Sequence, residues 1–130
     1  TYVPASIKKN NIYLILIGKS PPKKNLWHRI RGGGIYADKS VNEFTDAAYL
    51  QIKKQLGSYK PITGPVAVDV VFFTDDRPDM DNLLCGLLDC LQDCGVLKND
   101  RLVRRVNMRR EKTRPSEART AINIGELERA

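Results

Sequence analysis

Hydrophobic and polar positions along the chain form a pattern that predicts four strands. Residues 11–17 are apolar on both alternating faces, which predicts a strand covered on both sides. Residues 66–74 are β-branched and aromatic almost throughout, so this strand is expected in the centre of a sheet. Residues 101–110 predict a strand with two unlike faces. Residues 119–124 predict the last strand, followed by a frayed tail over residues 125–130.

Two stretches of helical spacing lie between these strands. Ser40 and Glu43 form an S-x-x-E capping box that predicts the start of the first helix, and Gly57 is a natural stop. The second helix is expected to begin at residues 78–79 and to end at Gly95. Leucines at helical spacing predict its buried stripe, which consists of Leu83, Leu84, Leu87, Leu88 and Leu91.

The segment between the first strand and the first helix, residues 19–34, is expected to be a flexible basic loop. Its paired prolines cannot continue a central strand, and its glycine run lacks the flanks of a Walker loop. Its cations and its single tryptophan suit backbone phosphates and a splayed base. A solvated loop with a half-buried tryptophan is the alternative.

The order of elements is strand, loop, helix, strand, helix, strand, strand. A short turn at Pro115 joins the last two strands, which are therefore expected to pair antiparallel. The pattern predicts an α+β fold in which residues 1–130 form a single domain: one mixed β-sheet with two helices packed on it.

The charge balance changes the picture, because a formal net charge of +7 and a pI near 9.5 favour a polyanionic partner. A basic protein without any nucleic-acid role is the alternative. The sequence has no apolar run of about eighteen residues and no secretory signal pattern at its start, so a cytoplasmic location is expected.

Three cysteines, Cys85, Cys90 and Cys94, fall within the second predicted helix. An odd number argues against a disulfide framework, and the only histidine, His28, lies far away in sequence, which disfavours a zinc site. Buried, reduced thiols are therefore expected.

Carboxylates crowd the junction between the central strand and the second helix. Asp79 and Asp81, with one residue between them, could reach one ion, and Mg²⁺ prefers such oxygen ligands. A bound metal would screen a phosphodiester and activate water. Arg77 could hold a phosphate, and Asn82 could orient a carboxylate or a water. The alternative is that Asp79 serves only as a helix N-cap.

The same residues resemble the RusA family of Holliday-junction resolvases. The resemblance rests on R-P-D-M-D-N-L-L at 77–84, on L-L-D-C-L at 87–91, on Gly95 and on Asn99-Asp100 before a strand. The sequence P-P-K-K-N at 21–25 is similar to the opening of that family. The resemblance extends over residues 13–124.

The resemblance implies a homodimeric endonuclease, dependent on Mg²⁺ with Mn²⁺ as a substitute. It would resolve four-way DNA junctions by paired symmetric cuts in recombination and repair. It implies a bacterial or phage-encoded protein of the cytoplasm, associated with the nucleoid. The catalytic and metal-binding residues would be Asp79, Asp81 and Asp100. Expected DNA-binding residues are Lys23, Lys24, Asn25, Arg77, Asn82, Arg105 and Arg109.

Three positions depart from the family pattern. Cys85 stands where a catalytic lysine is usual, Asn99 replaces an acid, and Leu102 replaces a common glutamine. Lys98 could supply the missing cation. Two other functions remain open: a catalytically weak or inactive protein that binds branched DNA, and a flap or single-strand nuclease with the same fold.

The length of the second helix predicts how the site is assembled. About thirteen residues from Asp81 to Cys94, at about 1.5 Å each, separate the helix ends by roughly 20 Å. The link over residues 96–99 can span at most about 14 Å, so Asp100 cannot easily return to Asp79 and Asp81. A two-fold dimer with antiparallel second helices would instead combine carboxylates from both subunits at each site.

Overall fold

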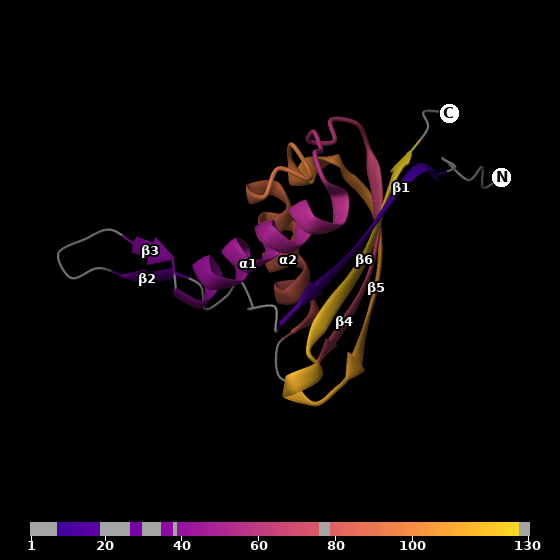
Figure 1. The fold of residues 1–130 in the computed structure, drawn as a ribbon. Helices are drawn as coiled ribbons and strands as arrows, with labels where there is room; N and C mark the ends of the chain where they lie inside the picture. The colour runs from indigo at the N-terminus through magenta and orange to yellow at the C-terminus, as the bar shows by residue number, and fades with distance from the viewer. Residues whose placement is uncertain (1–7, 19–26, 30–34, 38, 76–78, 128–130) are drawn as a thin grey trace.

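The structure is a computed structural model that describes residues 8–18, 27–29, 35–37, 39–75 and 79–127. Its elements are shown in Figure 1. In chain order they are β1 (Lys8–Ile17), β2 (Trp27–Arg29), β3 (Ile35–Ala37), α1 (Lys39–Leu56), β4 (Val66–Thr74), α2 (Met80–Asp93), the 3₁₀ turn η2 (Asp100–Leu102), β5 (Val103–Lys112), the 3₁₀ turn η3 (Pro115–Glu117) and β6 (Arg119–Leu127). None of the helices in the described ranges is long and apolar enough to cross a membrane.

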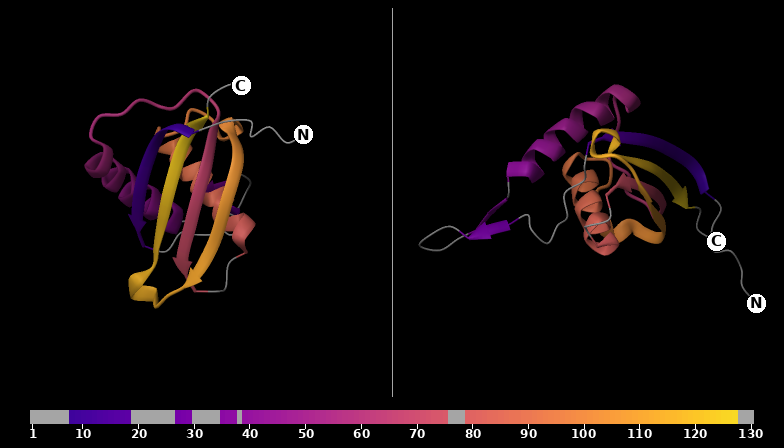
Figure 2. Two further views of the ribbon diagram at one scale, coloured as in Figure 1. Left: turned by 90° about the vertical axis from the view of Figure 1, so that its right-hand side faces the viewer. Right: turned by 90° about the horizontal axis from the view of Figure 1, so that it is seen from below.

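Four strands form one mixed sheet in the order β1-β6-β4-β5. Strand β4 pairs parallel with β5 and antiparallel with β6, and β6 pairs antiparallel with β1. Helices α1 and α2 cover one face of this sheet, and no helix of the described residues lies on the other face, as Figures 1 and 2 show. The predicted α+β fold, a mixed sheet with two helices packed on it, is confirmed.

The core lies between the sheet and the two helices. Alternate residues of β4 point into it, because successive side chains of a strand face opposite sides. In α2, Leu83, Leu87 and Leu91 are buried, while Leu84 and Leu88 are partly buried and pack against the same core. The predicted leucine stripe is therefore confirmed. The other buried side chains come mainly from β1, α1, β4 and β6: Leu14, Leu16, Ala48, Ile52, Val66, Val68, Val70, Phe72, Ile122 and Ile124.

Strand β1 differs from its prediction because it lies at an edge of the sheet and only one of its faces is covered. Leu14 and Leu16 are buried, but Tyr13, Ile15 and Ile17 are 67%, 50% and 62% exposed. The prediction of a strand covered on both sides was therefore wrong. Apolar residues on both faces gave it the pattern of a central strand.

The last strand also differs from its prediction, both in length and in position. Residues 125–127 continue β6, where they pair with β1 and β4, so the predicted frayed tail was wrong for these residues. Strands β5 and β6 do not pair with each other, although a short turn joins them. β6 instead lies between β1 and β4, which gives the apolar strand β4 a neighbour on each edge.

The predicted basic loop over residues 19–34 contains a strand. Trp27–Arg29 pairs antiparallel with Ile35–Ala37 in a small second sheet, located beyond the N-terminal end of α1 (Figures 1 and 2). The predicted loop was therefore wrong at residues 27–29. The expected DNA-contacting residues Lys23, Lys24 and Asn25 lie outside the described residues.

Candidate active site

The N-terminal end of α2 carries the two carboxylates that the sequence indicated. Asp79 occupies the N-cap position with an extended backbone, and its carbonyl oxygen accepts from the Leu83 N–H at 3.1 Å. The Asp79 carboxylate makes no capping hydrogen bond, and Asp79 is exposed. The side chain of Asp79 therefore does not fill the role that the N-cap alternative assigned to it.

Asp81 lies in the first turn of the same helix and is exposed, and Asn82 beside it is partly buried. Two carboxylates so close in sequence repel each other in the absence of a cation. The partial positive charge of the helix N-terminus offsets part of this repulsion. This end of α2 therefore combines exposed oxygen ligands with a local charge that a divalent cation would balance. Arg77, expected to hold a phosphate beside them, lies outside the described residues.

Asp100 lies at the other end of α2. It begins η2, and its backbone N–H donates to Oε1 of Gln92, in the last turn of α2, at 3.1 Å. The Asn99 side chain caps η2 by accepting from the Arg101 N–H at 2.9 Å. Asn99 replaces an acid of the family pattern, and the amide oxygen can cap the turn as a carboxylate would. Asp100 is exposed.

Sheet register shows how far apart these carboxylates are within one chain. In the parallel pair of β4 and β5, Val66 lies opposite Val103 and Thr74 lies opposite Lys112. Asp100 precedes the start of this pair, whereas Asp79 follows its end. The eight intervals of β4 span roughly 26 Å at about 3.3 Å per residue. Within the described part of the chain, no three His, Cys, Asp or Glu residues form a group that could hold a metal ion.

The structure therefore places Asp79 and Asp81 at the same helix end but leaves Asp100 at the opposite end of the sheet. Their assignment as ligands of one ion stays a prediction.

The three cysteines of the second predicted helix differ in their surroundings. Cys85 is exposed, four residues after Asp81 and so on the same side of α2, and the prediction of a buried thiol was wrong for it. Cys90 and Cys94 are buried. A hydrogen bond with the Cys94 thiol, together with burial, raises the pKa of Cys90, which therefore remains a protonated thiol. These two cysteines help to pack the C-terminal end of α2.

The two arginines expected to bind DNA, Arg105 and Arg109, lie on strand β5. Both are exposed, and in register they neighbour Ala67 and Val71, whose side chains point away from the helices. The structure thus places them on the helix-free face and not beside Asp79 and Asp81. The apolar side chains of β1 on the same face, Tyr13, Ile15 and Ile17, are exposed. Their exposure was not predicted, because apolar residues on both sides of a strand indicated one that is covered on both sides.

Comparisons with known proteins agree with the motif in α2. A family model described as Endodeoxyribonuclease RusA matches residues 18–125. The protein named "Crossover junction endodeoxyribonuclease RusA" from Aquifex aeolicus (strain VF5) is 29% identical over 92 residues, which cover 68% of this chain and 72% of that protein.

Proposed function

Because the chain belongs to the RusA family of endodeoxyribonucleases, we propose that it is a metal-dependent Holliday-junction resolvase that makes paired symmetric cuts in four-way DNA junctions. The observation that carries this proposal is the exposed pair Asp79 and Asp81 at the start of α2, where the Asp79 carboxylate is not used as a helix cap. Such a nuclease would act in recombination and repair, in the cytoplasm of a bacterium and in association with its nucleoid, whether encoded by the host or by a phage.

The donor set suits Mg²⁺, with Mn²⁺ as a substitute. Asp79 and Asp81 offer carboxylate oxygens, the ligands that Mg²⁺ prefers, and two carboxylates plus waters and substrate phosphate are a common set. A bound Mg²⁺ would supply charge screening and an activated water. The residues of the chain would hold the ion and keep the attacking water in line with the scissile phosphate.

Asp100 would complete the site from a second subunit. The exposed residues Asp81, Cys85 and Gln92 follow one another at helical spacing along one side of α2. An antiparallel α2 of a second copy, packed along this side, would bring its Gln92 end beside Asp81. Gln92 is the residue that holds the Asp100 backbone. A two-fold dimer built in this way has two equivalent sites, which suits two symmetric cuts.

DNA contacts would come from the basic residues around this dimer. Lys23, Lys24, Asn25, Arg77 and Asn82 are assigned to the junction by the family pattern. The exposed Arg105 and Arg109 could add phosphate contacts, and the net charge of +7 favours strong, salt-dependent binding.

A catalytically weak protein that binds branched DNA is the second candidate function. It is favoured by Cys85, which is exposed one turn beyond Asp81 at the position where the family pattern has a lysine. Without a cation there, the charge that develops on the scissile phosphate would be less well stabilised.

A cleavage assay separates these functions. Four-way junctions, flaps, duplexes and single strands of matched sequence would be incubated with the protein in Mg²⁺ and in EDTA. The expected result is paired, symmetric nicking of the four-way junction only when the metal is present. Equal cutting of flaps or single strands would contradict the junction preference, and cutting in EDTA would contradict the metal site. Binding of the junction without any cutting would favour the second candidate.

A further inference from the structure

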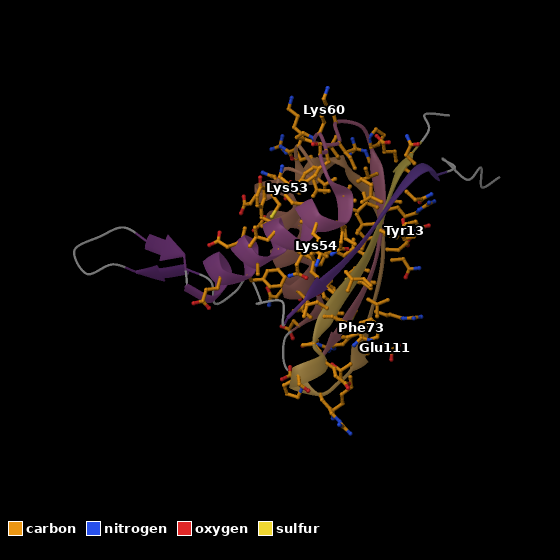
Figure 3. All side chains as sticks on the ribbon, viewed as in Figure 1. Tyr13, Lys53, Lys54, Lys60, Phe73 and Glu111 are labelled. Atoms are coloured by element: carbon orange, nitrogen blue, oxygen red, sulfur yellow. The ribbon has the colours of Figure 1, made fainter. Side chains whose placement is uncertain are left out.

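The sheet face that carries no helix, here called the open face, has one apolar and one polar half. Side chains of β1 that point away from the core form the apolar half, and the corresponding side chains of β5 form the polar half. Figure 3 shows Tyr13, Phe73 and Glu111 on this side of the sheet, opposite the helices. The open face is defined by Tyr13, Ile15, Ile17, Asp69, Val71, Phe73, Arg105, Asn107, Arg109, Glu111, Arg119, Ala121 and Asn123.

A hollow of about 460 Å³ lies on the open face. Tyr13 and Ile15 of β1 line it on one side, and Asn107 and Arg109 of β5 line it on the other. This volume falls within the range of about 300 to 1,000 Å³ that is typical of sites for small molecules. The hollow can therefore hold a flat group of the size of a nucleobase with its sugar.

Asn123 of β6 lies in this hollow, where it is the register neighbour of Tyr13. Its side-chain oxygen is buried and has no hydrogen-bond partner among the described residues. An acceptor left in this state costs stability. A turn of the partly buried Asn123 side chain toward the hollow would expose this oxygen to a ligand N–H, which would then form a hydrogen bond that the folded chain lacks. The amino and imino groups of nucleobases are such donors.

We propose that the open face binds single-stranded DNA, with an unpaired base in the hollow beside Asn123. The Tyr13 ring, 67% exposed, offers a surface on which a base can stack. Arg105 and Arg109 are exposed on the neighbouring strand and can contact the phosphates that flank such a base. The combination of aromatic, amide and arginine side chains on a four-stranded sheet is one that proteins use to bind unpaired nucleotides.

A second copy of the chain fits the open face less well. Two copies packed through their open faces would bring Arg105 and the ion pair of Arg109 with Glu111 (Nε to Oε1, 3.5 Å) into a dry interface, where removing charged groups from water is costly. Each α2 would then lie on the outside of the assembly with both sheets between them, so Asp100 could not reach the partner's Asp81.

Strand addition at the β1 edge is also blocked. Gln55 accepts from the Ile15 N–H at 2.9 Å and donates to its carbonyl oxygen at 2.7 Å, and Gln51 accepts from the Ile17 N–H at 2.7 Å.

The test compares two exposed tyrosines on opposite faces of the molecule. Tyr13→Ala removes the stacking surface, and the matched control Tyr49→Ala changes an exposed tyrosine of α1. Binding of a fluorescein-labelled oligothymidine would be measured by anisotropy in EDTA, so that the result does not depend on cleavage or on the metal site. Tyr13→Ala is expected to weaken this binding by roughly 5- to 150-fold, and Tyr49→Ala to leave it unchanged.

Two further measurements make the outcome decisive. An oligonucleotide with 5-iodouracil, irradiated with the wild-type protein, is expected to cross-link to peptides of β1 or β6. Sedimentation of Tyr13→Ala is expected to show the same oligomeric state as the wild type. Unchanged affinity of Tyr13→Ala for the oligothymidine, or cross-links confined to other segments, would overturn the proposal. Dissociation of the Tyr13→Ala protein into monomers would also overturn it, by identifying the open face as an interface between copies.

Discussion

The two ends of helix α2 are built in opposite ways. At the C-terminal end, the Cys94 N–H donates to the Cys90 carbonyl at 2.9 Å, and the Tyr59 hydroxyl donates to the Cys94 carbonyl at 2.6 Å. Gly95 adopts φ 76°, the left-handed conformation that ends helices without steric cost. The backbone groups that the end of a helix leaves without helical partners are thus satisfied by specific contacts.

Among the residues that the structure describes, none closes the N-terminal end of α2 in a comparable way. Asp79 makes no side-chain capping hydrogen bond, and Asp81 follows it in the exposed first turn. A capping bond stabilises a helix by about 1 kcal/mol, and like charges near each other destabilise it. The chain therefore forgoes stability at one end of α2 and secures it at the other. Residues that bind a ligand often lower the stability of the fold in this way.

The largest expected effect is at the N-terminal end. Asp81→Asn should lower the rate of junction cleavage by about a thousandfold or more, because it removes the proposed metal ligand and with it several kcal/mol of transition-state stabilisation. The free energy of unfolding should change by less than about 1 kcal/mol, since both charge repulsion and a helix-dipole contact are lost. Cleavage rates and urea unfolding would be measured together.

The matched control is Asp93→Asn, which changes an exposed acid in the last turn of the same helix, beside α1. It should retain cleavage. Equal losses in both variants would remove the distinction between the two ends of α2.

The second prediction asks whether the two helix ends meet across a dimer. Heterodimers of an Asp81→Asn subunit with an Asp100→Asn subunit should regain nicking of one junction strand, although each homodimer is inactive. In a shared site both defects fall in one site, and the other site is whole. Differently tagged subunits would be co-purified and assayed on a junction labelled in each strand. Absence of any recovered nicking would mean that each site lies within one subunit.

The contrast between local and long-range features explains how much the sequence could predict. The bounds of α2, its leucine stripe, the Gly95 stop and the run of β4 were predictable, because they depend on neighbours along the chain. The place of β6 between β1 and β4 was not, since pairing between distant strands leaves no periodic signal in either strand. The exposure of one face of β1 could not be predicted for a related reason. Apolar side chains exposed on a sheet face give the same sequence pattern as apolar side chains packed in a core.

The candidate site divides in the same way. The pair Asp79 and Asp81 and its place before a helix followed from local sequence, and so did the family resemblance, which the comparisons confirmed. The unused cap of Asp79 could not be predicted, because N-cap sequences do not reveal whether the side chain bends toward its helix. The capping role of Asn99 was also hidden, since it depends on the turn that η2 makes.

A smaller effect is expected one turn inside the N-terminal end. Cys85→Lys should speed cleavage by on the order of tenfold, equivalent to about 1.4 kcal/mol, because an ammonium near the scissile phosphate stabilises developing charge. Cys85→Met is the control, with a long but uncharged side chain. Single-turnover rates over a range of Mg²⁺ concentrations would be compared. Equal rates for the lysine and methionine variants would show that the position has no catalytic role.

The smallest effect is expected at the C-terminal end, from Tyr59→Phe. This change removes the hydroxyl that donates to the Cys94 carbonyl, and should lower the free energy of unfolding by about 1 kcal/mol while leaving cleavage intact.

Burial, followed by the electrostatic effects of Cys94 and Tyr49, raises the pKa of Tyr59 in the folded chain. The neutral phenol is therefore the form that the fold favours. Its contribution is fully present below the unfolded pKa of about 10 and is lost as the pH rises through the folded pKa. The stability difference between wild type and Tyr59→Phe should thus be constant between pH 7 and 9 and shrink in more alkaline solution. Urea unfolding from pH 7 into more alkaline solution would measure this stability difference, with Tyr49→Phe as the exposed control. A Tyr59→Phe protein that kept its stability but lost cleavage would show that this end of α2 also serves the chemistry.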